Sequence, residues 1–343
     1  MSFTEIFPLD ELITATFSGR YREDLAVITG PRSDPEIAAL VGRLVLEELG
    51  TKLHGALFAT KSVGAVFGLE LVSGERVVLK LFHPSHAMTA LVAMQRCIAL
   101  LVRSGFPAPP PRSRLFQTED GIAGSFYAFA DGEMRDGHDP AVRRELARTL
   151  AELTGLLARE DPQDLPLAPT QRQVLWPGSH RSFLQLDEVP EARWIDAIAG
   201  RAQSVVCATQ GPLIPAHLDW GVKNVRFRGD RVCVAYDWDS LCAASEAEMV
   251  GRAAAQFTAQ WDFAAPLTPT PDEARAFVAD YETARGRAFS DEESLVIVAA
   301  AEYLMAQVAR LELAAGDRRR DSFLALLQFC AHVPLLEVGA RQD

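Results

Sequence analysis

The sequence is poor in cysteine and lacks the features of a leader peptide. Its five cysteines are odd in number, scattered and without a C-x-x-C pair, which argues against a disulfide framework and against a zinc site. Residues 1–19 contain no basic segment and no long apolar stretch, so they do not resemble a signal peptide. The apolar run at 295–301 ends at Glu302, far short of the roughly 20 residues that span a bilayer. We therefore expect a soluble, cytoplasmic protein with no membrane partner.

Positive charge is also in deficit. The chain has 34 Lys and Arg against 46 Asp and Glu, a formal net charge of −12. Such a surface repels phosphate backbones, which argues against general nucleic-acid binding and is compatible with a cationic small substrate. The length of 343 residues, 48% of them hydrophobic and 23% charged, suits a globular protein with two domains or one large bilobal unit.

Hydrophobic spacing divides the chain into a strand-rich first third and a helical remainder. Asp34-Pro35 gives a helix cap and first turn, and Gly50 ends that helix. Runs rich in Val, Leu and Phe predict strands in the following segments. The expected elements are a helix at 34–49, strands at 57–72, 76–82 and 121–129, a small-residue loop at 60–64 and a helix at 88–102.

Capping signals mark the later helices. A capping box pairs a hydroxyl with a carboxylate three residues on, and each satisfies an orphan N–H of the first turn. Three are predicted: Ser245 with Glu248, Thr270 with Glu273, and Ser290 with Glu293. Helices from Asp139 onward, including 290–315 and 318–330, carry apolar faces that indicate a core.

One short segment combines residue types that carry chemistry. His217, Asp219 and Asn224 form the pattern H-x-D-x-x-x-x-N, and Asp237 follows thirteen residues after Asn224. This is the spacing of the catalytic loop and metal-binding Asp of kinases. Asp219 could accept the proton of an attacking hydroxyl, while Asn224 and Asp237 could supply oxygen ligands to Mg²⁺.

The residues after this segment predict a β-hairpin. Segments 225–228 and 231–234 flank Gly229-Asp230, a pair suited to a tight turn. If Arg228 pairs with Arg231, Asn224 lies opposite Ala235. Asp237 then shares a pleat face with Asn224, roughly 7–8 Å away, and the hairpin would act as a metal clamp. Asp239 joins that face only if the strand continues.

Lys80 lies within a run of apolar strand residues. It is either on a solvated strand face or placed to contact an anion. Next to a kinase-like metal clamp we favour the second interpretation, a strand lysine that reaches nucleotide phosphates.

From about Leu53 onward, the chain resembles the superfamily of aminoglycoside phosphotransferases and choline-kinase-like small-molecule kinases. The most specific matches are the segments 217–224 and 236–240, supported by Lys80 and the segment 105–109. The resemblance implies an α+β, protein-kinase-like bilobal fold. Residues 1–130 would form a nucleotide-binding lobe with a helical extension at 34–50, and 131–343 a helical lobe with the catalytic loop and substrate site.

The resemblance also implies site residues, ATP with Mg²⁺ as cofactors, and a small molecule with a hydroxyl group as the phosphate acceptor. Asp219 would be the base, Asn224 and Asp237 the metal ligands, and His217 a structural support, with Asp239 ranked below Asp237. The nucleotide would meet Lys80, Ser62, Gly64, Tyr127, Phe129 and Ala130. Acceptor-binding candidates on the helical lobe are Glu246, Trp261, Asp262 and Asp280, although helix capping and solvation would also explain them.

The sequence departs from the family pattern in two places. Members usually carry a Glu on the first-lobe helix that pairs with the strand lysine, whereas segment 88–104 contains no acid and Gln95 is the nearest polar candidate. The glycine-rich loop is reduced to Ser62 and Gly64. These departures keep open a catalytically silent nucleotide-binding protein. A protein kinase is disfavoured because Asp-Phe-Gly and Ala-Pro-Glu motifs are missing.

Overall fold

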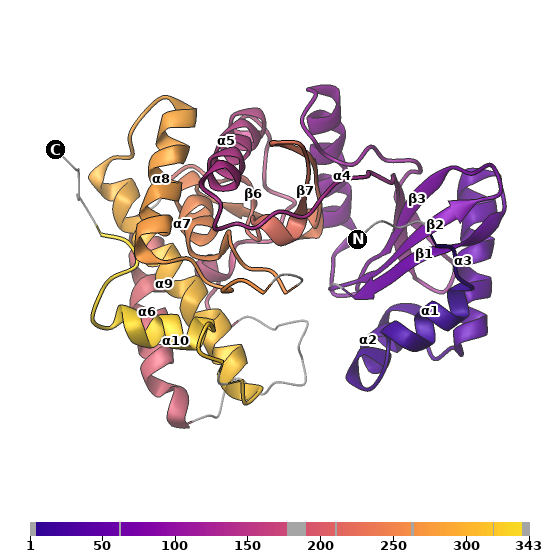
Figure 1. Cartoon of the computed structure of the whole chain (residues 1–343), viewed down its shortest axis with the longest axis horizontal. Helices are drawn as coiled ribbons and strands as arrows, with labels where there is room; N and C mark the ends of the chain where they lie inside the picture. The colour runs from indigo at the N-terminus through magenta and orange to yellow at the C-terminus, as the bar shows by residue number, and fades with distance from the viewer. Residues whose placement is uncertain are drawn as a thin grey trace. The chain divides into compact units, whose positions relative to one another are not determined.

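The chain folds into two compact units. The computed structural model describes residues 5–61, 63–176, 190–209, 211–261, 264–317 and 319–337. One unit comprises Met1–Arg103 with Ala108–Asp131, and the other comprises Ser104–Pro107 with Gly132–Asp343. The first holds the larger sheet and the second most of the helices (Figure 1), so the predicted α+β class is confirmed.

The first unit is built on a five-stranded antiparallel sheet with the order β1-β2-β3-β5-β4. Burial alternates along β3, where Val77, Leu79 and Leu81 are buried and the residues between them, including Lys80, are half-buried. This period of two points one set of side chains into the core. The strands are β1 (Leu53–Lys61), β2 (Ala65–Leu71), β3 (Arg76–Leu81), β4 (Phe116–Gln117) and β5 (Ala123–Ala128).

Three helices at the start of the chain complete the core of this unit. They are α1 (Leu9–Thr16), α2 (Arg20–Thr29) and α3 (Asp34–Leu49), and α4 (Met88–Arg103) follows β3 (Figure 1). Apolar residues of the first three helices form one cluster with those of the sheet, among them Ile37 and Leu79. The sequence predicted only α3 of these three. Its N-cap is Ser33, which forms a capping box with Glu36, and not Asp34 as predicted.

The second unit is mainly helical and contains two small β-pairs. The helices are α5 (Pro140–Leu157), α6 (Arg193–Ala208), α7 (Glu246–Gln256), α8 (Pro271–Arg285), α9 (Asp291–Ala314) and α10 (Phe323–Cys330). Strand β6 (Ile214–His217) pairs with β9 (Leu241–Ala244), and β7 (Val225–Arg228) pairs with β8 (Arg231–Ala235). Helix α10 is shorter than the predicted 318–330 because Ser322 caps its first turn.

Helix α9 packs against α6, α7 and α10. Within the described residues it is the one helix long and apolar enough to cross a membrane, and 61% of its apolar window is buried inside the structure. A core helix of a globular protein meets the same length and hydropathy criteria.

One predicted capping box is incomplete. The pairs Thr270–Glu273 and Ser290–Glu293 form both hydrogen bonds. The Oγ atom of Ser245 accepts a hydrogen bond from the N–H of Glu248. The Glu248 carboxylate, however, is fully buried and accepts from the Thr170 hydroxyl. Helix capping therefore does not explain the Glu248 side chain; its role is to join α7 to the segment before α6.

Candidate functional site

His217 is the buried support of the loop that follows β6. Its Nε2 donates to the carbonyl of Tyr236 at 2.8 Å, and the Ser240 hydroxyl donates to Nδ1 at 3.1 Å. Its ring lies edge-on between Trp220 and Trp238, with centroids 5.5 and 5.3 Å away. Burial lowers the pKa of His217, which favours the neutral ring. With both nitrogens engaged, the imidazole ties the loop to the segment after β8.

Asp219 and Asn224 converge across the loop. The Asn224 amide nitrogen donates to the Asp219 carbonyl at 2.7 Å and to its Oδ2 atom at 2.9 Å. The other carboxylate oxygen, Oδ1, lies 2.7 Å from the Lys223 ammonium. Because the Asn224 nitrogen faces Asp219, the amide oxygen is the atom that can bind a cation. The Asp219 side chain is 31% exposed, so a solvent-borne hydroxyl can reach it.

Helix α7 fixes the backbone beneath these side chains. The carbonyl of Leu218 accepts from Gln256 Nε2 at 2.9 Å and from Arg252 Nε at 3.4 Å. The Val222 N–H donates to the Phe257 carbonyl at 2.9 Å. A Cβ atom at Gly221 would lie only 3.1 Å from the Gln256 carbonyl oxygen, so the tight approach of loop and helix favours glycine.

The register of the β7–β8 hairpin differs from the prediction. Arg228 pairs with Arg231 as expected, but Arg226 pairs with Val234, so the ladder is shifted by one residue. The Tyr236 N–H donates to the Asn224 carbonyl at 2.7 Å. Tyr236, and not Ala235, therefore lies opposite Asn224. The extra residue is a β-bulge, a device that re-aims side chains next to sites.

Asp237 lies outside the strand, in a left-handed conformation. Its φ of 64° and ψ of 42° make it the residue other than glycine with positive φ in the described part of the chain. A short 3₁₀ turn, Trp238–Ser240, follows at once. The predicted pleat face shared by Asn224, Asp237 and Asp239 is therefore absent, because the strand ends at Ala235. Strained backbone conformations of this kind are found preferentially at functional sites.

The predicted metal ligands form a small donor set. Over the described ranges, no three His, Cys, Asp or Glu side chains group to hold a metal ion. The candidate set is instead one amide oxygen, from Asn224, and one carboxylate, from Asp237. That donor chemistry suits Mg²⁺, which commonly takes one or two protein carboxylates and completes its shell with phosphate oxygens and water.

Two of the predicted nucleotide residues, Lys80 and Tyr127, lie on the neighbouring strands β3 and β5 of the first unit. Lys80 pairs in the ladder with Ser125, and Val78 pairs with Tyr127, so Lys80 and Tyr127 project from the same face of the sheet. The Gln95 amide nitrogen donates to the Tyr127 hydroxyl at 2.6 Å. Gln95, the polar residue of α4 predicted to lie nearest Lys80, therefore bonds to this tyrosine.

The other predicted nucleotide residues lie nearby in the chain. The Phe129 ring is 6.5 Å from the Phe58 ring, and Ala130 follows it. A Cβ atom at Gly64 would collide with the Leu81 carbonyl oxygen, so close packing on β3 already accounts for this glycine. Ser62 lies outside the described residues.

The predicted acceptor residues divide into two groups. Glu246 accepts from the Tyr281 hydroxyl at 2.7 Å, and Asp280 pairs with Arg143 at 2.8 Å, so both carboxylates serve contacts between helices. Trp261 is 62% exposed, and its ring centroid is 5.7 Å from the Lys223 ammonium. Trp261 is thereby linked through Lys223 to Asp219. Asp262 lies outside the described residues.

A cavity opens beside Trp261. Its volume is about 410 Å³, and its walls include Gln260, Leu267, Arg319 and Asp321.

Sequence reasoning missed three residues of the loop's surroundings: Lys223, Arg252 and Gln256. Lys223 lies inside the motif, four positions after Asp219, and this spacing was the available signal. Nothing in the sequence marks Arg252 or Gln256, because their contact with Leu218 joins segments 34 and 38 residues apart.

The two units together have the fold of a protein-kinase-like phosphotransferase. The model of the phosphotransferase enzyme family (APH) matches residues 64–292. This span is more than half of the chain, and the protein belongs to that family. No curated protein matches the sequence significantly.

Solved structures support the same fold at low sequence identity. An amicoumacin kinase in complex with AMP-PNP, Ca²⁺ and Ami is 11% identical, with a TM-score of 0.63, and the match covers 88% of this chain and 97% of that one. A Plasmodium vivax ethanolamine kinase is 13% identical, with a TM-score of 0.58 and coverages of 90% and 92%. An AMP-bound spectinomycin phosphotransferase is 14% identical, with a TM-score of 0.52 and coverages of 89% and 99%. At these identities the likeness establishes the fold alone.

Proposed function

We propose that the protein is an ATP- and Mg²⁺-dependent O-phosphotransferase that acts on a hydroxyl of a small molecule. One observation carries the proposal: the Asp219 carboxylate is partly exposed, and the amide of Asn224 holds it through Oδ2 at 2.9 Å. A general base needs a fixed orientation and access to its substrate, and this arrangement provides both. Membership of the phosphotransferase family supports the assignment.

In this proposal each residue has a defined task. Asp219 accepts the proton of the acceptor hydroxyl while the oxygen attacks the γ-phosphorus and ADP departs. Asn224 and Asp237 would hold Mg²⁺, whose charge offsets that of the phosphates. Lys80, with Ser62 and Gly64, contacts phosphates, and the segment from Tyr127 through Phe129 to Ala130 receives the adenine. His217 supports the loop, and Asp239 has a role secondary to that of Asp237.

Substituting the base tests the proposal. Asp219→Ala should lower turnover by about 10²–10⁴-fold, the usual contribution of a general base, and should leave MgATP binding nearly unchanged. ADP release is measured over a panel of aminoglycosides, spectinomycin, macrolides, amino alcohols and sugars. Asp291→Ala, at an exposed helix start, is the matched control. Near-normal turnover in Asp219→Ala would remove this residue from the mechanism.

A catalytically silent nucleotide-binding protein is the second candidate. Two observations favour it: α4 lacks an acidic residue in its first turn, and Gln95 bonds to Tyr127. Thermal unfolding with and without MgATP separates the two functions when combined with the ADP assay. A rise in melting temperature with no ADP release over the whole panel would select the silent protein.

A further inference from the structure

Lys223 occupies a position that the motif itself does not require. Its ammonium lies 2.7 Å from Asp219 Oδ1, and its side chain is 23% exposed. The same ammonium is 5.7 Å from the centroid of the Trp261 ring, within the range of a cation–π contact. A carboxylate and an aromatic face thus hold this charge at the edge of the loop.

The backbone around Lys223 is fixed on both sides. The Asn224 N–H donates to the Gly221 carbonyl at 3.1 Å, and the Val222 N–H donates to Phe257 at 2.9 Å. The side chain can therefore adjust only through its own rotamers.

Distance places this charge beside the reacting atoms of the proposed reaction. A hydroxyl that gives its proton to Asp219 must come within about 2.6–3.2 Å of a carboxylate oxygen. If that oxygen is Oδ1, 2.7 Å from the ammonium, the hydroxyl oxygen lies at most roughly 6 Å from the ammonium.

The charges near Lys223 change during phosphoryl transfer. The acceptor O–H bond breaks, and its proton moves to Asp219. The acceptor oxygen bonds to the γ-phosphorus, while the bond to the bridging oxygen breaks and its electron pair leaves on ADP. Asp219 then becomes neutral, so Lys223 loses the anion that faced it before transfer. The phosphoryl group, which carries negative charge, is then bonded to the acceptor oxygen.

We propose that Lys223 is a second catalytic residue, whose ammonium stabilises the phosphoryl group as it moves to the acceptor. The inference rests on the proposed function. Before transfer, the Asp219 carboxylate neutralises the charge of the ammonium, and it does so less as it takes up the proton. The interaction between the ammonium and the phosphoryl group therefore becomes more favourable toward the transition state. Only such a differential interaction raises kcat.

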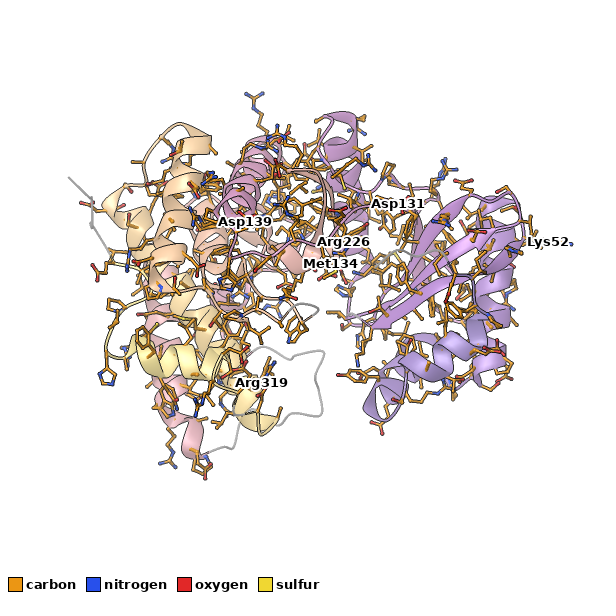
Figure 2. The ribbon with its side chains drawn as sticks, in the orientation of Figure 1. Lys52, Asp131, Met134, Asp139, Arg226 and Arg319 are labelled. Atoms are coloured by element: carbon orange, nitrogen blue, oxygen red, sulfur yellow. The ribbon has the colours of Figure 1, made fainter. Side chains whose placement is uncertain are left out.

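A purely orienting role is the alternative, in which Lys223 simply holds Asp219 in place by a hydrogen bond. Three substitutions separate charge from hydrogen bonding. Lys223→Arg keeps both, Lys223→Gln keeps a donor without charge, and Lys223→Met keeps neither. Lys52→Met, at an exposed position in the first unit (Figure 2), is the matched control.

The experiment measures ADP release from MgATP with water as acceptor and with the panel acceptor that gives the highest rate. We expect Lys223→Met and Lys223→Gln each to lower kcat by about 10–10²-fold. KM for MgATP should change by less than about twofold, since the charge acts mainly in the transition state. Lys223→Arg and Lys52→Met should keep most of the wild-type kcat. Circular dichroism and thermal unfolding verify that each variant is folded.

Each result decides the question. Wild-type kcat in Lys223→Gln would reduce Lys223 to an orienting role, and wild-type kcat in Lys223→Met would remove it altogether. If either occurs while Asp219→Ala abolishes turnover, the inference fails and the proposed function stands. Absence of ADP release from the wild-type protein with every acceptor contradicts both. An unfolded Lys223→Met leaves Lys223→Gln and Lys223→Arg as the deciding pair.

Discussion

Lys80 and Asp237 are both candidates for handling phosphate charge, yet different kinds of backbone hold them. Lys80 belongs to a regular strand, with Ser125 opposite and buried neighbours on either side. Asp237 follows a bulged strand and has a left-handed conformation. Regular strand geometry fixes the direction of a side chain by alternation alone. At Asp237, by contrast, surrounding contacts must hold a conformation that the isolated residue disfavours.

The difference shows which segments of the second unit are held in place by contacts from other segments. His217, two tryptophan rings and Gln256 all serve the position of the loop and of the turn after β8. Preorganised groups of this kind need no rearrangement when charge develops, which is the main source of electrostatic catalysis.

The largest effect should come from relieving the backbone at Asp237. Asp237→Gly removes a proposed metal ligand and also the steric cost of positive φ. We expect turnover to fall by about 10²-fold or more, while the free energy of unfolding rises by roughly 0.5–1 kcal/mol. ADP release and urea unfolding measure the two quantities.

Lys80→Met is the comparison variant for this experiment. It also removes a charge proposed to meet phosphate, but from a regular strand, so no stabilisation should accompany its loss of activity. If Asp237→Gly were no more stable than the wild type, the left-handed conformation would carry no cost. The contrast between the two positions would then fail.

A moderate effect is expected from the helix that supports the loop. Gln256→Leu removes the shorter of two hydrogen bonds to the Leu218 carbonyl. We expect kcat to fall about tenfold through misplacement of Asp219, with a loss of about 1 kcal/mol in stability. Steady-state kinetics and urea unfolding test this, with Gln328→Leu at an exposed position of α10 as control. Unchanged kcat in a destabilised Gln256→Leu would show that α7 supports the fold and not the loop geometry.

The smallest effect concerns pH. Burial lowers the pKa of His217 in the folded protein, so the unfolded chain binds its proton more readily. The contribution of neutral His217 to stability is complete above its unfolded pKa of about 6.5 and is lost as the pH falls through that value. Urea midpoints at pH 7.5 and 5.5 should therefore differ more in the wild type than in His217→Gln. The exposed His332→Gln should retain the wild-type difference, and an equal difference in all three proteins would argue against this role.

Much of the architecture could be predicted from local pattern. The spacing of buried residues and Gly50 marked α3, and Gly229-Asp230 marked the turn between β7 and β8. The helices α1 and α2 were missed because they span only 8 and 10 residues, too short for periodicity to separate from loop. At Ser245 only one of the two predicted capping hydrogen bonds forms, the one from the Glu248 N–H to the Ser245 hydroxyl. The Glu248 carboxylate bonds instead to Thr170, 78 residues away.

In the candidate site, too, local sequence predicted some features and contacts between distant segments decided the others. The sequence by itself determined that Asp219 and Asn224 lie on one loop and that a hairpin separates Asn224 from Asp237, since neighbouring residues form both. From the motif spacing it predicts that the three residues share one chemistry. Only the tertiary structure decided the bulge before Tyr236, the left-handed turn at Asp237, and the contacts of Leu218 with α7. These depend on packing between distant segments, and such packing selects among backbone conformations that local sequence leaves nearly equal in energy.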